Sequence, residues 1–343
     1  MIRRAAALAL ALGLPLGAAA SPKLLGFQQL DGWAADDHAA ALTAFLETCR
    51  DLRDRDWQAL CGVAGEAEDA RSFFELFFLP VMVEDGAEAL FTGYYEPELR
   101  GSEVPDGRHV APVYRVPEDL PSEGPWLTRQ QIEEGGALKG RGLEIAYVDP
   151  VELFFFQIQG SGRVRLPSGQ VIRLGYGAAN RQPYSSIGQE LVARGIYEPH
   201  QVSADVIRSW VRRNPVDGRE LLWTNRSYVF FREVNEVPPE RGPLGAMNRS
   251  ITPLRSIAVD PSIVPLGAPV WIETEGEDRF RRLMIAQDTG SAIKGAQRAD
   301  IFFGTGKLAG KRAGRTRDTG RMVMLLPIQR ALDMLPQTLA DPA

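Results

Sequence analysis

Histidine is scarce in this sequence, and the shortage argues against two large classes of active site. Only three histidines occur among the 343 residues, at His38, His109 and His200, and they are far apart in the chain. A catalytic zinc site or a Ser-His-Asp triad needs a histidine near other ligands or near a nucleophile. We therefore expect neither, and no feature of the sequence indicates a metal ion or a cofactor.

Long apolar runs are also missing. The first 20 residues combine Arg3 and Arg4 with the apolar stretch Ala5 to Gly17 and the small residues at 18–20, which is the pattern of a cleaved signal peptide. A membrane anchor is the alternative, but a spanning helix needs about 20 apolar residues. No cysteine lies at the cleavage site, so a lipid anchor is not indicated. We expect export and a soluble mature protein.

Cysteine is limited to two residues, Cys49 and Cys61, which lie close together in the sequence. An exported chain reaches an oxidising compartment, where such a pair can close. We expect a disulfide, and the alternative is a pair of buried thiols on helical faces.

Basic stretches are absent as well. Lys and Arg total 39 against 44 for Asp and Glu, which gives a net charge of −5, and the arginines are scattered. A mildly acidic protein without a basic run is a poor binder of nucleic acids. We expect no nucleic-acid partner and a partner that is neutral or polar.

The N-terminal part should be helical. Asp36 and Asp37 can cap a helix with apolar residues on helical spacing up to Cys49. A second helix should start near Asp69 and end at Pro80. We interpret its aromatic stripe as a core-facing surface without chemistry; the stripe consists of Phe73, Phe74, Phe77 and Phe78.

After Gly86 the pattern changes to short β-rich segments separated by Gly and Pro, which predicts a barrel or a strongly bent sheet. The expected strands lie within residues 89–102, 109–117, 142–148, 151–162, 163–169, 170–177 and 227–233. Helices with hydroxyl N-caps should interrupt them at Thr128, at Ser185 or Ser186, and at Ser203, the last stopping at Asn214.

The Pro- and Gly-rich connector over residues 237–248 is the best domain boundary. An all-β region of about 80 residues should follow it. Its expected strands lie within residues 255–260, 265–274, 281–288, 299–306 and 321–327. The last dozen residues lack a periodic pattern and read as a frayed tail.

Three aspartates stand at strand ends in this region. Asp260 closes one apolar run, Asp288 closes a second, and Asp300 opens a third, with Lys294 in the Gly-rich loop between the last two. Any one of these aspartates could be a turn former. Together they fit a converging site in which like charges raise one carboxyl pKa while Lys294 keeps another group ionised.

An aspartic protease is an alternative, because Asp-Thr-Gly occurs at Asp288 and again at Asp318. Only 30 residues separate the two triplets, which is too few to hold a protease lobe between them. Asp318 also follows a basic, Gly-containing stretch, which we interpret as a solvated turn. Proteolysis is therefore disfavoured.

Several motifs in one order resemble the membrane-bound lytic murein transglycosylase A family along nearly the whole mature length. They are FTGYYEPELRGS (91–102), FFFQIQGSGRVRL (154–166), GYGAANRQPYSSIG (175–188), NRSYVFFRE (225–233), RSIAVDPSIVPLGAPVW (255–271) and DTGSAIKGAQRADIFFGTG (288–306). The last two resemble that group's three-aspartate domain. The chain departs from the family at Ser291, at Arg226 and in lacking a lipid-anchoring cysteine.

The resemblance implies a mainly β protein with N-terminal helices and two domains. Residues 21–98 and 240–338 would form a double-psi β-barrel catalytic domain, and residues 99–239 would form an inserted second β-barrel. A groove between them would take the glycan strand of peptidoglycan. The protein would act as a monomer in the periplasm, soluble or peripheral to the outer membrane.

By the same resemblance, Asp300 matches the single catalytic acid and base, with Asp260 and Asp288 as companions. Asp288 would raise the pKa of Asp300 or hold Lys294, and Asp260 would position the loop. The expected product is a 1,6-anhydro-N-acetylmuramyl end, formed when the C6 hydroxyl of the sugar closes onto C1.

The plausible groove wall comprises Tyr94, Tyr95, Glu96, Gln159, Gly160 and Ser161, because aromatic faces stack on sugars and amides bond N-acetyl groups. The alternative is structural, with the first three at a strand edge and the last three in a tight hairpin. Glu96 is the second candidate acid. Two other functions stay open: an inverting hydrolase that pairs Asp300 with Asp288, and a glycan-binding module without catalysis.

Overall fold

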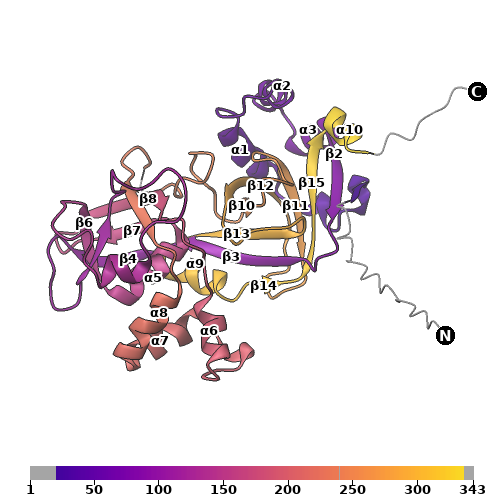
Figure 1. The fold of residues 1–343 in the computed structure, drawn as a ribbon. Helices are drawn as coiled ribbons and strands as arrows, with labels where there is room; N and C mark the ends of the chain where they lie inside the picture. Colours follow the sequence, from indigo (N-terminus) through magenta and orange to yellow (C-terminus); the bar gives the residue numbers. More distant parts are fainter. Residues whose placement is uncertain (1–20, 239, 336–343) are drawn as a thin grey trace, which may run out of the picture.

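The protein has two lobes, each built around its own β-sheet (Figure 1). The structure is a computed structural model that describes residues 21–238 and 240–335. The predicted signal peptide over residues 1–20 and the end of the expected tail lie outside these ranges. Among the residues described, no helix is both long and apolar enough to cross a bilayer.

The first lobe is a nine-stranded sheet, ordered β1-β2-β15-β11-β12-β10-β13-β3-β14, that forms a nearly closed barrel. Its strands are β1 (Ser21–Leu24), β2 (Phe78–Glu84), β3 (Leu90–Glu96), β10 (Ser256–Val259), β11 (Pro269–Thr274), β12 (Arg281–Thr289), β13 (Arg298–Thr305), β14 (Arg317–Asp318) and β15 (Gly320–Pro327). Strands from both ends of the chain therefore share one sheet, and β3 lies between β13 and β14.

Three helices precede or border this barrel: α1 (His38–Thr48), α2 (Arg55–Ala64) and α3 (Ala70–Phe77), after the short 3-10 turns Phe27–Gln29 and Trp33–Ala35. Asp37 caps α1 and Asp69 caps α3, as predicted. The aromatic stripe is core, because Phe73 and Phe74 pack with Phe45. The helix predicted to start near Asp69 is α3, and it ends before Pro80 because the chain is already extended at Phe78.

A disulfide joins Cys49, which caps the C-terminus of α1, to Cys61 in α2, with 5.5 Å between the Cα atoms. The two cysteines lie 12 residues apart in the sequence. The bridge ties the first two helices together, as the sequence predicts.

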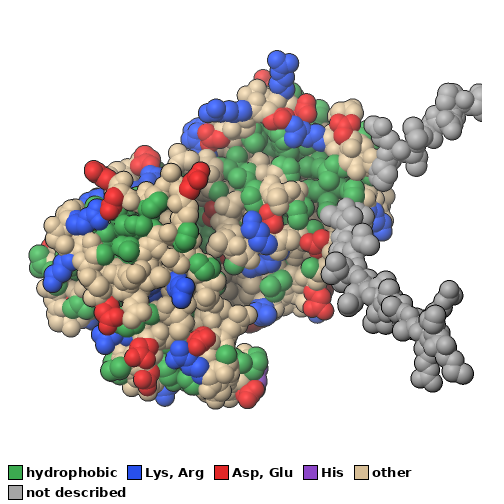
Figure 2. All heavy atoms as spheres, viewed as in Figure 1, with side chains coloured by type: hydrophobic (Ala, Val, Ile, Leu, Met, Phe, Trp, Pro, Cys, Tyr) green, Lys and Arg blue, Asp and Glu red, His purple; other side chains and the backbone are tan. Residues whose placement is uncertain are grey.

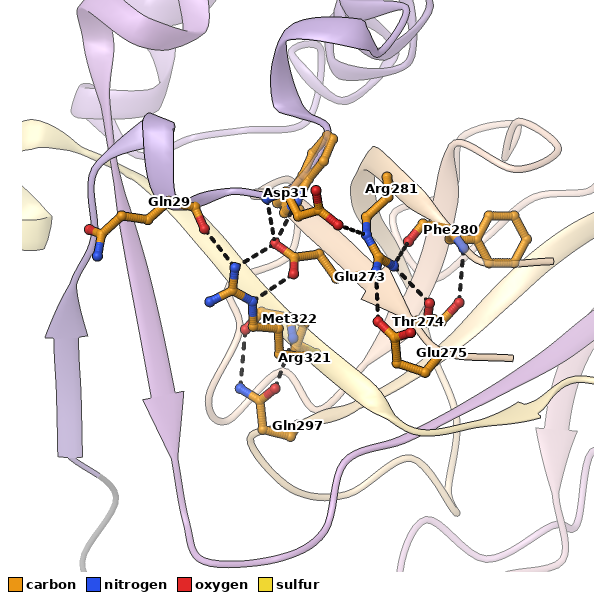
Figure 3. Close-up of polar contacts among 11 residues, drawn as sticks. Gln29, Asp31, Glu273, Thr274, Glu275, Phe280, Arg281, Gln297, Arg321 and Met322 are labelled. Atoms are coloured by element: carbon orange, nitrogen blue, oxygen red, sulfur yellow. Dashed lines mark hydrogen bonds and ion pairs between the residues drawn. The ribbon is translucent and has the colours of Figure 1, made fainter. Parts of the chain in front are cut away.

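A polar network fastens the N-terminal segment to the barrel (Figure 3). Its centre is Glu273 of β11, which is buried and forms an ion pair of 2.7 Å with Arg321 of β15. The backbone N–H of Asp31 donates to the same carboxylate at 3.1 Å, and Arg321 donates to the carbonyl of Gln29. These bonds neutralise a buried charge and hold the chain ahead of α1 in place.

The second lobe is a six-stranded sheet, ordered β5-β6-β4-β7-β8-β9. Its strands are β4 (Glu98–Ser102), β5 (Ala111–Tyr114), β6 (Glu144–Val148), β7 (Gly162–Arg165), β8 (Val171–Ala179) and β9 (Val229–Glu233). A bridge between Arg115 and Phe231 links the two edges of this sheet. The second lobe is therefore a small curled sheet, in agreement with the expected second β-domain.

Helices pack beside this sheet: α4 (Arg129–Glu133), α5 (Pro150–Gln159), α6 (Ile187–Ala193), the 3-10 turn Pro199–Gln201, α7 (Ala204–Arg213) and α8 (Pro215–Thr224). The predicted N-caps are confirmed, because Thr128, Ser186 and Ser203 each accept a backbone N–H from the first turn of a helix. Helix α7 ends before Asn214, but α8 starts directly after it, with Pro215 at its first position.

The prediction of a strand over residues 151–162 is wrong. This segment forms α5, because Asp149 accepts the N–H groups of Val151 and Glu152 and Pro150 is the first helical residue. Three consecutive phenylalanines have the composition of a buried strand. They are helical here, and a helix that is covered on both faces is also apolar all round. The alternative of a tight hairpin at Gln159 to Ser161 is also wrong, because Gln159 ends a helix.

The region after the connector is not purely β. Two helices interrupt it, α9 (Gly306–Ala313) and α10 (Ile328–Asp333). All five strands expected there are present, as β10 to β13 and β15. Helix α9 packs on β3 and β13, next to the point where the two lobes join.

The chain passes between the lobes twice, at Pro97 between β3 and β4 and through residues 234–255 between β9 and β10. Both passages lie close together, because Arg163 donates its backbone N–H to the carbonyl of Pro97 and its side chain to the carbonyl of Arg241. Figure 2 shows the surface hollowed where the two lobes meet. The domain limits at residues 99 and 239 remain a prediction, although these passages lie near them.

Candidate active site

Strand β10 brings two of the three aspartates together. It runs parallel to β12 and antiparallel to β13, and its Ala258 is the register partner of both Asp288 and Asp300. The β10–β12 register shifts between Ile257 and Ala258, so Gln287 has no partner there. Such a bulge re-aims the next side chain, and Asp288 and Asp300 therefore flank one residue of a central strand.

Asp300 is partly accessible and sits in an environment that favours its protonated form. Burial raises the pKa of its carboxyl, and a hydrogen bond from Thr92 and the positive charge of Arg298 oppose this rise. The Thr92 hydroxyl lies 2.6 Å from Oδ1 of Asp300. A carboxyl that is desolvated but still reachable has the properties of a general acid.

Asp288 is also partly accessible, but its oxygens are occupied. Its Oδ2 accepts the hydroxyl of Tyr94 at 2.9 Å, and its Oδ1 accepts the backbone N–H groups of Ala246 and Thr289 at 3.0 and 2.9 Å. Burial raises the pKa of Asp288 to about 6, and the charge of Asp300 adds to the rise. These bonds fix Asp288 in place beside Asp300.

Asp260 is of a different kind, because it is buried and strongly hydrogen-bonded. Its carboxylate accepts the Ser262 hydroxyl at 2.7 Å and the backbone N–H of Gly295 at 3.1 Å. The Ser262 hydrogen bond, followed by the backbone donors and Lys294, holds its pKa at about 2. Asp260 is therefore an ionised anchor for the loop between β12 and β13.

Lys294 serves Asp260 and not Asp288. Its Nζ lies 3.5 Å from Oδ1 of Asp260, and its side chain is 64% exposed. The possibility that Asp288 holds Lys294 is thus wrong, whereas the expected partnership between a lysine and an ionised aspartate is present.

Side chains at the end of β3 point alternately to the two faces of the sheet. Thr92, Tyr94 and Glu96 share one face, and the first two contact Asp300 and Asp288. The ring of Tyr94 also packs on Phe302, with 5.3 Å between centroids. Burial and the neighbouring Asp288 raise the pKa of Tyr94 well above its usual value, so its hydroxyl stays a donor.

Tyr95 points to the other face of β3 and is half-buried. A Cβ at Gly310 of α9 would lie 2.6 Å from the Tyr95 ring, so only glycine fits there. The backbone N–H of Tyr95 donates to the side chain of Gln159, at the end of α5, at 3.2 Å. Tyr95 and Gln159 therefore join the two lobes.

Gly160 and Ser161 follow Gln159 and are partly accessible. Gly160 ends α5 with a φ of 74°, a left-handed conformation that favours glycine. The segment lies between α5 and β7, on the second lobe's side of the junction with β3.

Glu96, the second candidate acid, is fully buried. Its carboxylate forms ion pairs with Arg163 of β7 at 2.9 Å and Arg173 of β8 at 3.1 Å, and it accepts the Thr305 hydroxyl at 2.7 Å. A carboxylate with two arginine partners and no exposed surface is poorly placed to protonate a sugar. The structure favours an anchoring role for Glu96 between the lobes.

Asp318 is not in a solvated turn, as the sequence suggested. It is buried in β14 and faces a separate cavity of about 260 Å³. The residues that line this cavity are Glu277, Asp278, Arg312, Arg315, Thr316 and Asp318. Burial raises the pKa of Asp318, but Asp318 contacts none of the three site aspartates through any hydrogen bond or ion pair between described residues.

Sequence reasoning missed three parts of the site: Thr92, Arg298 and the backbone of Ala246. Period-two alternation along β3 could have placed Thr92 beside Tyr94. The same rule places Arg298 on the face of Asp300 in β13. Nothing local marks Ala246, which reaches Asp288 from the connector. Among the described residues, no group of three or more His, Cys, Asp or Glu side chains could hold a metal ion.

Two family models match the chain along the two lobes. The MltA specific insert domain matches residues 90–232, and the 3D domain matches residues 255–326. The second match contains all three aspartates, and the first begins at β3, which carries Thr92 and Tyr94.

Named relatives agree with these matches. The membrane-bound lytic murein transglycosylase A of Vibrio cholerae is 35% identical over 247 residues, which cover 68% of this chain and 64% of that relative. The chain thus matches less than two thirds of that relative's length. A crystal structure of a membrane-bound lytic murein transglycosylase from Agrobacterium tumefaciens is 32% identical, with a TM-score of 0.83 over 92% of this chain and 99% of that one.

The chain belongs to the membrane-bound lytic murein transglycosylase A (MltA) family. A further member of known structure is E. coli MltA with bound chitohexaose, at 28% identity and a TM-score of 0.73, with 89% of this chain and 94% of that chain covered. The family and the mainly β, two-lobed fold expected from the motifs are confirmed.

Proposed function

We propose that this MltA family member is a lytic transglycosylase that cleaves the β-1,4 bond between N-acetylmuramic acid and N-acetylglucosamine in peptidoglycan. The observation that carries the proposal is the state of Asp300, a reachable carboxyl whose pKa is raised by burial. The names of its relatives and the chitohexaose bound by E. coli MltA support a glycan substrate. The glycan would lie in the hollow between the lobes (Figure 2).

In the first step, protonated Asp300 gives its proton to the oxygen that bridges the two sugars. The C1–O bond breaks, and positive charge develops on the N-acetylmuramyl ring as in an oxocarbenium ion. Asp300 is then ionised, and the hydrogen bond from Thr92 becomes charge-assisted.

In the second step, Asp300 takes the proton of the C6 hydroxyl of the same sugar. The freed oxygen attacks C1 and closes the 1,6-anhydro ring. Because the nucleophile belongs to the substrate, one carboxyl suffices, and the enzyme contributes orientation and proton transfer.

We assign supporting roles to the other two aspartates. Asp288, fixed by Tyr94 and two backbone donors, would raise the pKa of Asp300 through its negative charge when it is ionised. Asp260 would keep the loop with Lys294 and Gly295 in position.

The groove wall on the second lobe would include Gln159, Gly160 and Ser161, with Tyr95 opposite them on β3. These residues are partly accessible and lie where the lobes meet. The enzyme would be exported to the periplasm and act there as a monomer, soluble or peripheral to the outer membrane.

An Asp300→Asn variant tests the assignment. Purified sacculi are incubated with the wild type and the variant, and released muropeptides are analysed by mass. Loss of an acid and base group should lower anhydro-product release by at least about 100-fold. Asp205→Asn is the matched control, because Asp205 is 95% exposed on α7. Anhydro-product release by Asp300→Asn at the wild-type rate would overturn the role of Asp300.

An inverting hydrolase would need Asp288 to activate water. This is disfavoured, because both oxygens of Asp288 already accept hydrogen bonds. In water labelled with heavy oxygen, a hydrolase would place the label at new reducing ends, whereas the anhydro reaction incorporates none. Sacculus binding without any turnover by the wild type would instead indicate a binding module.

A further inference from the structure

Arg298 is a desolvated cation close to Asp300 with no carboxylate in ion-pair contact among residues 21–238 and 240–335. It stands two residues before Asp300 on β13 and therefore shares its face of the sheet. Its Nη2 donates to the Thr92 hydroxyl at 2.8 Å, and its Nη1 donates to the carbonyl of Ala299 at 2.6 Å. The carbonyls of Leu90 and Ala299 thus hold Nη1 in place, and Nη2 is directed at Thr92.

This contact decides where the hydroxyl proton of Thr92 points. A guanidinium can only donate, so the Thr92 oxygen must accept from Arg298. The single proton of the hydroxyl is then free for the other neighbour, Oδ1 of Asp300, at 2.6 Å. Oδ1 consequently accepts a hydrogen bond whether Asp300 is neutral or ionised.

We propose that Arg298 and Thr92 form a proton-orienting relay that leaves Oδ2 of Asp300 as the oxygen that carries and delivers the catalytic proton. Both are positioning residues, since Arg298 acts through Thr92 and Thr92 acts through Asp300. The inference rests on the proposed role of Asp300 as the acid.

The relay also favours the ionised product of the first step. A hydroxyl bond to a carboxylate is stronger than one to a neutral carboxyl, so the Thr92 bond strengthens as the proton leaves. An arginine in direct contact with Asp300 would keep it ionised and useless as an acid. The Thr92 hydroxyl passes the polarising effect of Arg298 to Asp300, and it keeps the guanidinium out of direct contact with the carboxyl.

Other charged or titratable groups near this pair come from neighbouring strands. Asp288 of β12 and Tyr94 of β3 face Asp300, and Arg317 of β14 faces Arg298. None of them donates to Oδ1 of Asp300 among the hydrogen bonds of the described residues. Their effects are present in every variant below, and only the direct charge effect of Arg298 on Asp300 changes with Arg298→Met. A relay differs from that charge effect in requiring Thr92.

The test compares the pH profiles of kcat for Thr92→Val, Thr92→Ser and Arg298→Met on a soluble glycan with release of anhydro product. Activity is lost as pH rises through the pKa of Asp300, because the acid must be protonated. Removing a donor to the carboxylate raises that pKa. Thr92→Val should therefore move the basic limb of the kcat profile to higher pH. Because it also removes the hydrogen bond that stabilises the forming carboxylate, it should lower kcat by roughly 10-fold to 100-fold.

Thr92→Ser retains the hydroxyl and should keep the wild-type limb. Arg298→Met should move the limb in the same direction as Thr92→Val, and in the Thr92→Val background it should add little further loss. Arg298→Lys retains a donor and should fall between the wild type and Arg298→Met.

A merely structural role predicts another pattern: lower thermal stability and kcat with the limb unmoved in both Thr92→Val and Arg298→Met. That result would overturn the relay. If Thr92→Val does not fold, the pair Thr92→Ser and Arg298→Met decides on the same criterion. An Asp300→Asn variant with full activity would instead overturn the proposed function, so the two failures are distinguishable.

Discussion

Strand β3 touches two groups of poorly solvated carboxylates, and they are treated in opposite ways. At Thr92 and Tyr94 it meets Asp300 and Asp288, which each accept one hydroxyl. Asp288 also accepts backbone N–H groups. At its last residue it supplies Glu96, which is fully buried between Arg163 and Arg173. The two groups lie a few residues apart on one strand but differ in their access to cations.

The difference explains which carboxylates can do acid chemistry. Burial without a cation in direct contact raises the pKa values of Asp288 and Asp300. Burial between two guanidinium groups satisfies the charge of Glu96 and makes it a cross-link between β3 of one lobe and β7 and β8 of the other. The same residue chemistry thus serves as a proton donor in one place and as an anchor in the other.

The largest effect should follow from breaking the anchor. Glu96→Ala leaves the buried Arg173 and the partly buried Arg163 without their shared partner, so the free energy of unfolding should fall by about 3–5 kcal/mol. Urea unfolding followed by circular dichroism at pH 7 measures the change.

Glu98→Ala is the matched control, two residues away. Glu98 pairs with Arg165 of β7, but both side chains are partly exposed, at 32% and 47%. Removing it should change the free energy of unfolding by less than about 1 kcal/mol. Equal effects at the two positions would show that burial of the ion pair does not matter here.

The acid group should behave in the reverse way. Asp288→Asn removes a carboxyl that the folded state prefers to keep neutral, and its amide oxygen can still accept from Ala246 and Thr289. At pH 7 the variant should be more stable than the wild type by about 2 kcal/mol, since one pKa unit corresponds to about 1.4 kcal/mol and partial access to solvent reduces the effect.

The sign of the pH dependence follows from linkage. The pKa of Asp288 is raised to about 6 in the folded protein, so its contribution to stability is complete below its unfolded value near 3.8 and is lost as pH rises through 6. Urea unfolding at pH 4 and pH 7 should show the advantage of Asp288→Asn only at pH 7. A variant less stable than the wild type at both values would contradict this.

How much of this contrast is visible in the sequence depends on how far apart the partners lie. Asp260, Asp288 and Asp300 could be predicted as a group, because each closes or opens an apolar run within one region. Thr92 reaches Asp300 across 208 positions and Arg163 reaches Glu96 across 67. Such pairs depend on sheet order, which the local pattern does not determine.

The fold shows the same limit. Capped helices and alternating strands were predictable, since Asp37, Thr128 and Ser203 carry their own local signal. The run Leu153 to Phe156 was misjudged, because a fully buried helix and a buried strand share the same apolar composition. The burial of Asp318 was equally hidden, as β14 consists of two residues only.

Replacing the loop anchor Asp260 should change the free energy of unfolding less than replacing Glu96 or Asp288. Asp260→Ala removes an acceptor for the N–H groups of Ser262 and Gly295, so the free energy of unfolding should fall by about 1 kcal/mol at pH 7. Asp260 has a pKa lowered to about 2, so its stabilisation is present above 3.8 and is lost as pH falls through 2. The gap between variant and wild type in urea should narrow from pH 4 downward, and a gap that widens would contradict the prediction.

The smallest effect should come from the lysine beside that anchor. Lys294→Met removes a cation 3.5 Å from Asp260, but the lysine side chain is 64% exposed and water screens the pair. The free energy of unfolding should change by less than about 0.5 kcal/mol in urea at pH 7. The hydrogen bonds from Ser262 and Gly295 lower the pKa of Asp260 more than Lys294 does. A loss as large as that of Asp260→Ala would mean that Asp260 depends on a cation, as Glu96 does, and the contrast between anchors with and without cations would have to be redrawn.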